Sequence, residues 1–139
     1  MHGLEGAEEL LVGVASVDQE HEQLASRVNR CIAAGEGDLS DDEVRGLVAE
    51  VIVFAIEHFA NEEQVMLRLG YPGVDAHIDA HEKAVRQLYT YGLNKHGAAL
   101  SASVGFFLKS WFLAHANTHD RAFGQWVAER AVEPCPVEP

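Results

Sequence analysis

Two pairs of polar side chains stand four residues apart in this chain, His58 with Glu62 and His77 with His81. Residues at this spacing lie one above the other on the same face of an α-helix. Both pairs occur in stretches whose apolar residues recur at helical spacing, so we expect them on the inward face of a helix. Two imidazoles on an apolar face are costly to desolvate without partners. The spacing therefore predicts a bundle of helices around a polar centre.

Capping signals and glycines divide the chain into four predicted helices. Residues 16–19 and 40–43 have the form of capping boxes and predict the starts of the first two helices. Gly35 and Gly37 predict the end of the first helix, and Gly70 predicts the end of the second. Pro72 suits the first turn of the third helix. The fourth helix is predicted to start near residues 99–103.

Each predicted helix carries an inward stripe that contains at least one His. The expected inward residues are Val17, His21, Leu24, Val28, Cys31 and Ile32 in the first helix; Leu47, Val51, Phe54, Ala55, His58, Glu62, Val65, Met66 and Leu69 in the second; Val74, His77, Ile78, His81, Ala84, Val85 and Leu88 in the third; and Val104, Phe107, Leu108, Trp111 and His115 in the fourth. Short connections imply antiparallel neighbours, which predicts an all-α, up-down-up-down four-helix bundle. We expect one domain over residues 1–139, with an N-terminal arm, a core over about 10–131 and a disordered tail at 132–139.

Composition limits the classes of partner. The 139 residues carry a net charge of −12 without a basic patch, which argues against nucleic acid and against an anionic membrane surface. No continuous apolar run approaches the roughly 20 residues of a membrane span, and the N-terminus shows no secretion signal. Two cysteines are too few for a disulfide framework; we expect Cys31 to be buried and Cys135 to be exposed. The expected location is the cytoplasm.

Taken singly, each inward His is more readily explained as a hydrogen-bonded core residue than as a metal ligand. Taken together, the inward polar residues fall at similar depth in an antiparallel bundle, and they are His21, His58, Glu62, His77, His81 and His115. So many buried polar groups around one point would be costly unless bound cations satisfy them. Imidazole combined with carboxylate suits iron, copper or zinc better than magnesium or calcium. Five imidazoles exceed the usual share of one ion, so the sequence predicts two ions.

Two ions need a bridging carboxylate, and Glu62 and Asp120 are the candidates. Asp120 lies five residues after His115, about 140° around an ideal helix, so the two do not share a face. His119 lies four residues after His115 and is the geometric alternative. A kink or break just past His115, capped by Asn117 or Thr118, would re-aim Asp120. Spacing alone leaves this choice open, and His2 and His96 are expected on the surface.

The pattern of these residues resembles the hemerythrins, specifically the single-domain bacterial kind, over roughly residues 10–125. The family pattern is His, then HxxxE, HxxxH and HxxxxD, and it reads here as His21, His58 with Glu62, His77 with His81, and His115 with Asp120. Flanking residues match as well: Val17, Asp18, Leu24, Phe59, Glu63, Met66, Gly70, Tyr71, Pro72 and Trp111. The resemblance selects Asp120 over His119.

This resemblance implies a di-iron centre with an oxo or hydroxo bridge that binds O2. One iron would be held by His77, His81 and His115. The other would be held by His21 and His58, with an open position, and Glu62 and Asp120 would bridge the pair. A dry pocket would surround the O2 site, with Phe112, Trp111 and Phe59 as candidate lining residues. Phe112 departs from the family, which commonly has Leu three residues before the last His.

Within this resemblance, the preferred function is reversible O2 binding for carriage, storage or delivery to an oxygen-using enzyme. The alternatives are a module that senses O2, redox state or nitric oxide for a signalling partner, and a di-iron enzyme acting on peroxide or nitric oxide. The chain is expected not to be an enzyme, because no dedicated acid–base residue accompanies the ligands. A ferritin-like oxidase would need Glu-x-x-His and a zinc protease would need His-Glu-x-x-His, and neither motif occurs in the sequence.

Overall fold

The protein is an all-α bundle, as the sequence predicts. The computed structural model describes residues 15–132. Its elements are α1 (Ala15–Ala34), α2 (Asp41–Leu69), α3 (Val74–Asn94), α4 (Gly97–His115), the π-helical segment η2 (Ala116–Asp120) and α5 (Arg121–Val132). No strand occurs within this range. The predicted N-terminal arm and tail, with His2 and Cys135, lie outside the described residues.

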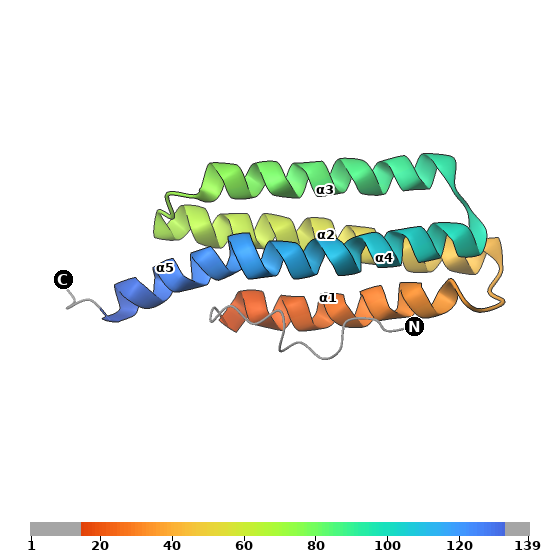
Figure 1. Cartoon of the computed structure of the whole chain (residues 1–139), viewed down its shortest axis with the longest axis horizontal. Helices are drawn as coiled ribbons and strands as arrows, with labels where there is room; N and C mark the ends of the chain where they lie inside the picture. Colours follow the sequence, from red (N-terminus) through yellow and green to blue (C-terminus); the bar gives the residue numbers. More distant parts are fainter. Residues whose placement is uncertain (1–14, 133–139) are drawn as a thin grey trace.

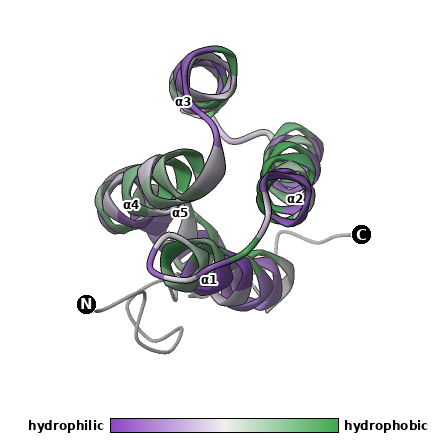
Figure 2. Cartoon of the chain, turned by 90° about the vertical axis from the view of Figure 1, so that its right-hand side faces the viewer, coloured by the Kyte–Doolittle hydropathy of each residue, from purple (hydrophilic) through white to green (hydrophobic). Residues whose placement is uncertain are grey.

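The helices form the predicted up-down-up-down bundle (Figure 1). Seen along its length, successive helices are neighbours around the ring, and α1 lies diagonally opposite α3 (Figure 2). The segment η2 joins α4 to α5 without a loop, so these three elements form one long helical run. Each of the four corners of the bundle can therefore send side chains to a common interior.

The ends of α2 follow the predicted capping chemistry. The Ser40 hydroxyl accepts from the Glu43 backbone N–H and the Glu43 carboxylate accepts from the Ser40 N–H, which confirms the second capping box. Gly70 ends the helix with a φ of 75°, and Tyr71 N–H donates to the Met66 carbonyl in a Schellman arrangement. These bonds fix where α2 stops and how the chain enters α3.

Three predicted boundaries differ from the structure. Ser16 already lies within α1, so it is not a helix cap. Pro72 lies in the turn that precedes α3, because Val74 is the first helical residue and Gly73 is its N-cap. The fourth helix starts at Gly97, earlier than predicted, where a φ of 61° suits a residue without a Cβ.

The inward stripes form the core, with exceptions in α2, α3 and α4. All the predicted inward residues of α1 are buried. Leu69 is wrong as a core residue because its side chain is 50% exposed in the last turn of α2. The predicted inward residues that are only half-buried are Leu47, Phe54, Val65, Val74, Ile78, Val85, Phe107 and Trp111. A smaller cluster of Val17, Met66 and Phe123 closes one end of the bundle against Tyr71 and Trp126.

Helices α1 and α4 approach closely through small residues. A Cβ built on Gly105 would lie 2.7 Å from the Ile32 side chain and 3.0 Å from its backbone nitrogen. Nearby, the Ser101 hydroxyl donates a 2.6 Å hydrogen bond to the Cys31 carbonyl oxygen. Cys31 is buried as predicted, and burial raises the pKa of its thiol to about 11. These contacts make Cys31 a packing residue of the α1–α4 interface.

Gly105→Ala is expected to destabilise the protein, whereas Gly46→Ala is expected to stabilise it. Both glycines are inside helices, where alanine gains up to about 1 kcal/mol in propensity. At Gly46 nothing lies within 4 Å of the new methyl group, so this gain is kept. At Gly105 overpacking against Ile32 costs about 1–3 kcal/mol and outweighs the gain. Urea unfolding followed by circular dichroism measures both changes; equal shifts in the two variants would contradict the close approach.

The helical run from Gly97 to Arg130 differs from the expectation that no stretch of the chain could span a membrane. By length and composition alone it is long and apolar enough to do so, although its apolar residues do not form one continuous run. The same run carries His115 and Asp120, whose side chains are buried against the other helices. It is therefore accounted for as a core helix of the bundle.

Candidate metal centre

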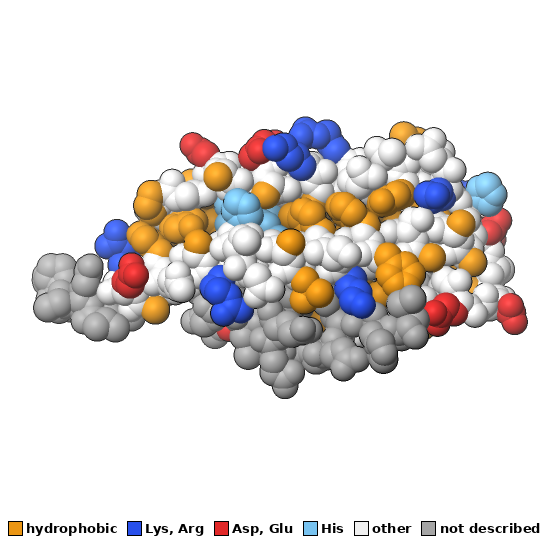
Figure 3. All heavy atoms as spheres, in the orientation of Figure 1, with side chains coloured by type: hydrophobic (Ala, Val, Ile, Leu, Met, Phe, Trp, Pro, Cys, Tyr) orange, Lys and Arg blue, Asp and Glu red, His pale blue; other side chains and the backbone are white. Residues whose placement is uncertain are grey.

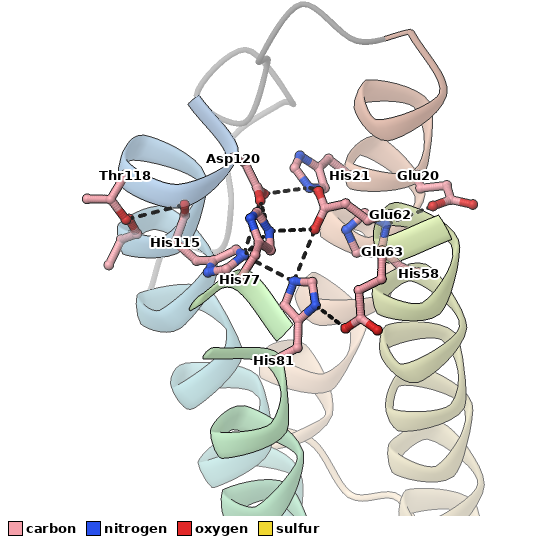
Figure 4. Close-up of polar contacts among 11 residues, drawn as sticks. Glu20, His21, His58, Glu62, Glu63, His77, His81, His115, Thr118 and Asp120 are labelled. Carbon is pink, nitrogen blue, oxygen red and sulfur yellow. Dashed lines mark hydrogen bonds and ion pairs between the residues drawn. The ribbon is translucent and has the colours of Figure 1, made fainter. Parts of the chain in front are cut away.

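The structure brings the seven predicted metal ligands to one buried place in the bundle (Figure 4). Every helix of the bundle contributes: α1 gives His21, α2 gives His58 and Glu62, α3 gives His77 and His81, α4 gives His115, and η2 gives Asp120. None of these residues is more than 4% exposed. The inward stripes that pack the core thus also converge these polar groups.

Three imidazoles and two carboxylates meet on one side of this cluster. The Nε2 atom of His77 lies 2.9 Å from a Glu62 oxygen and 2.8 Å from an Asp120 oxygen. His81 Nε2 lies 3.0 Å from Glu62 Oε1, and His115 Nε2 lies 3.1 Å from Asp120 Oδ1. Because all five present a ligand atom within 4.8 Å of the others, this group can hold one metal ion.

A second group lies on the other side of the same carboxylates. His21, His58 and Glu62 also present ligand atoms within 4.8 Å of one another. The second oxygen of Asp120 lies 3.1 Å from His21 Nε2, and the second oxygen of Glu62 lies 3.9 Å from it. Glu62 and Asp120 therefore each face both groups, as a pair of bridging carboxylates must.

The π-helical segment explains how Asp120 reaches the interior. In an α-helix a residue five positions after His115 would point elsewhere, but one π turn adds a residue per turn and brings it back. A kink or break capped by Asn117 or Thr118 was expected at this point, and the structure has a π turn in a continuous helical run instead. The Asn117 and Thr118 side chains donate to the Leu113 and Ala114 carbonyls within this run. His119 is half-buried and stacks on His115 at 5.1 Å between ring centroids, outside both groups of ligand atoms.

Two outer carboxylates support the imidazoles, and sequence reasoning missed their role. Glu20 accepts from His58 Nδ1 at 2.8 Å and from the Asn61 amide at 2.9 Å. Glu63 accepts from His81 Nδ1 at 2.8 Å. Each bond leaves Nε2 of its imidazole directed at the cluster and fixes the ring orientation. The available signal was the position of Glu20 and Glu63, each directly beside a predicted ligand in sequence.

The three candidate pocket residues lie at different parts of the cluster. Phe112 is fully buried and contacts the rings of His21 and His58, at 6.0 and 6.2 Å between centroids. Phe59 stacks on His81 at 4.1 Å, and Trp111 stacks on His115 at 4.3 Å. Phe59 also contacts His58 of the two-imidazole group, at 5.9 Å, whereas Phe112 contacts ligands of that group only.

The donor set fits a pair of metal ions. His58 Nε2, Glu62 Oε2 and both oxygens of Asp120 are buried without a hydrogen-bond partner, although imidazole nitrogens lie close to the Asp120 oxygens. Buried polar atoms in this state are costly, since neither water nor a well-aligned donor compensates them. Imidazole nitrogen and carboxylate oxygen suit iron, copper or zinc. A cation on each side would compensate the unsatisfied atoms together.

Without a bound metal, the carboxylates and imidazoles of the cluster shift one another's pKa values. Burial and the Asp120 carboxylate raise the pKa of Glu62, but the imidazoles of His77 and His81 outweigh them and lower it to about 2. Burial lowers the pKa of His77, but the Asp120 and Glu62 carboxylates have the larger effect and raise this pKa to about 9. At neutral pH, before any metal binds, His77 is therefore protonated and Glu62 is ionised.

Metal binding at pH 7 is expected to release about one proton from His77, because a ligand imidazole must be neutral. The release should fall to about half a proton at pH 9, where half of the free protein has already lost it. Apparent affinity should accordingly rise with pH and level off above 9. Calorimetry of Zn²⁺ binding in two buffers of different ionisation enthalpy measures the number; identical heats in both buffers at pH 7 would contradict a protonated His77.

Comparison with known proteins shows which family and which relatives this sequence matches. A family model described as the hemerythrin HHE cation binding domain matches residues 12–127. The chain is 27% identical over 121 residues to the bacteriohemerythrin of Stenotrophomonas maltophilia, covering 86% of this chain and 78% of that protein. It is 23% identical over 117 residues to the bacteriohemerythrin of Pseudomonas aeruginosa, covering 84% and 76%. The myohemerythrin of Riftia pachyptila is 24% identical over 109 residues, covering 78% and 81%.

Proposed function

The chain is a member of the hemerythrin family, and we propose that it binds O2 reversibly for carriage, storage or delivery. Hemerythrins bind O2 at a non-heme di-iron centre and are O2-binding proteins rather than enzymes. The observation that supports the proposal is the meeting of all seven residues of the family pattern in one buried cluster. We further propose that the protein works in the cytoplasm, since the long apolar helical run found within residues 15–132 carries His115 and Asp120, which are buried in the bundle.

We assign one iron to His77, His81 and His115 and the other to His21 and His58, bridged by Glu62 and Asp120. The two groups of converging ligand atoms, which share Glu62, support this division. The first group has three imidazoles and the second has two, so the second iron keeps an open position for a ligand. Phe112 contacts both imidazoles of the second group and is therefore the side chain that we assign to the pocket at that position.

When bound, the iron pair supplies the electrons that O2 takes up. The protein's own part is to fix the ligands and to keep water away from them. Glu20 holds His58 through Nδ1, so the imidazole on the open side cannot rotate. The complete burial of His21 and Phe112 excludes water from the same side. These features suit a site that must release O2 unchanged.

A visible spectrum of the iron-loaded protein tests this function. The protein is reduced without oxygen, exposed to air and then purged with argon. We expect a band that appears in air and disappears on purging, as reversible O2 binding requires. If air gives only the oxidised spectrum and purging changes nothing, the carrier function is wrong, and a sensing or enzymatic role of the di-iron site replaces it.

Phe112→Leu is expected to speed autoxidation about threefold or more, without loss of iron. The smaller side chain leaves space beside His21 and His58 for water, and a lowering of the barrier by ~0.7 kcal/mol suffices for this change. Phe123→Leu is the matched control, because Phe123 is equally buried but packs against Tyr71 and Trp126 at the end of the bundle. Decay of the oxygenated spectrum measures the rates; equal rates in both variants would remove Phe112 from the pocket.

A further inference from the structure

A surface hollow between α3 and α4 reaches the metal centre from the side of His115. The hollow has a volume of about 240 Å³, and its lining contains no carboxylate. It is lined by Ala80, Trp111, Ala114, His115, Thr118 and His119, and we name it the α3–α4 hollow. In Figure 3 a band of hydrophobic side chains with a His at its centre runs along this face.

Stacked rings connect this hollow to a proposed iron ligand. His115 is the most exposed of the seven ligands, at 4%. Its ring lies between Trp111, at 4.3 Å and 14° between planes, and His119, at 5.1 Å and 30°. Trp111 and His119 are both half-buried, so their edges reach the surface. A continuous path of conjugated rings therefore leads from solvent to the three-imidazole group.

The charges of the protein are distributed unevenly around this path. Residues 15–69, which include α1 and α2, contain 12 Asp and Glu against 4 Lys and Arg, a net charge of −8. Residues 70–132 contain 5 Asp and Glu against 6 Lys and Arg, a net charge of +1. In this second part of the chain, Arg121 is exposed, and Lys83 forms an exposed pair with Asp79. An anion is thus repelled least on the side of α3, α4 and α5.

An iron pair that binds O2 must be returned to its ferrous state whenever it is oxidised. Reduction of both ferric ions consumes two electrons, so two one-electron carriers are oxidised for each centre restored. A carrier has little direct access to the ligands, because none of them is more than 4% exposed. We propose that the α3–α4 hollow is the docking face for an acidic one-electron carrier protein, whose electrons pass through Trp111 or His119 to His115. This inference rests on the proposed function.

Other hollows near the centre suit such a carrier less well. The hollow between α2 and α3 reaches His81 but carries Glu63 and Glu82 against one cation, Arg86. The hollow beside Glu62 carries Glu20 as well, against Arg68. A basic carrier would be drawn to the acidic surface of α1 and α2, away from the stacked rings. The α3–α4 hollow therefore favours an acidic donor.

Small charged reductants test the path in the iron-loaded, oxidised protein. Ala114→Glu adds one negative charge to the hollow, and Ala49→Glu adds the same charge at an exposed helical alanine of α2. With the Fe(II)–EDTA dianion at low salt, Ala114→Glu should reduce the protein about three- to fivefold more slowly than Ala49→Glu, and 0.5 M salt should remove the difference. With the hexaammineruthenium(II) dication the order should reverse, which a structural defect would not produce.

Binding of an acidic [2Fe–2S] ferredoxin, with both proteins oxidised, gives a second readout without electron transfer. Ala114→Glu should weaken the association measured by NMR titration, and Ala49→Glu should not. Two irons per chain and an O2-dependent spectrum in both variants would show the proposed function intact. Equal reduction rates and equal affinities in such intact variants would overturn the docking face alone, whereas loss of O2 binding in the parent protein would overturn the proposed function.

Discussion

A His77→Ala chain is expected to lose stable iron loading, whereas a His96→Ala chain is expected to retain two irons. His77 Nε2 lies within 3 Å of Glu62, Asp120 and His115, so it occupies the middle of the three-imidazole group. Its removal takes one nitrogen ligand from that iron and leaves both carboxylates short of a partner. The loss of affinity should be at least about 10–100-fold, the range found when even an outer partner of a metal ligand is removed.

Iron per chain after gel filtration against a mild chelator measures this effect. His96 is an exposed histidine before α4 and controls for the removal of an imidazole as such. Circular dichroism of both variants shows whether the helices remain. Two irons per chain in folded His77→Ala would refute the assignment of His77 as a ligand.

Asp120→Asn is expected to abolish the iron pair, whereas His119→Ala is expected to preserve it. The amide keeps the size of Asp120 but removes the negative charge and one of the two oxygens that face His21 and His77. It cannot bridge two cations as a carboxylate does. His119 contacts the centre only by stacking on His115 and His77, so its loss leaves the ligand set complete.

This pair of variants decides between the two alternatives that sequence spacing left open. Iron analysis and the visible spectrum in air measure the outcome. If His119→Ala loses the iron pair while Asp120→Asn keeps it, the imidazole four residues after His115 is the ligand and the π turn has another role. The same samples also show whether a single iron remains in Asp120→Asn.

Helical periodicity predicted the bundle because burial and spacing agree over most of each helix. His21, His58, His77 and His115 all lie inward where their apolar neighbours do. The rule failed at Leu69, because a stripe extends along the sequence beyond the point where other helices still cover it. Pro72 was expected in the first turn of α3 but lies before it. The hydrogen bonds that end α2 involve Gly70 and Tyr71, and α3 begins only at Val74.

Other parts of the site depend on contacts between helices, which one sequence does not display. The bond from His58 to Glu20 joins α2 to α1, and the bond from His81 to Glu63 joins α3 to α2. No spacing rule within one helix relates these partners. The stacking of Trp111 on His115 is local to α4, yet the hollow beside it is completed by Ala80 of α3. Such features follow from packing rather than from periodicity.

The π turn at Ala116–Asp120 has a consequence at the level of the gene. A π turn holds one residue more than the α-helical turn it replaces, so it is equivalent to the insertion of one codon. An in-frame deletion of one codon among 116–119 would restore a regular helix, in which the bridging carboxylate stands four residues after the last imidazole ligand and still faces inward. Phe123, which closes the end of the bundle, would keep its direction for the same reason. The π turn thus lets the gene carry one codon more or fewer at this point without changing which side chains the following helix presents to the interior.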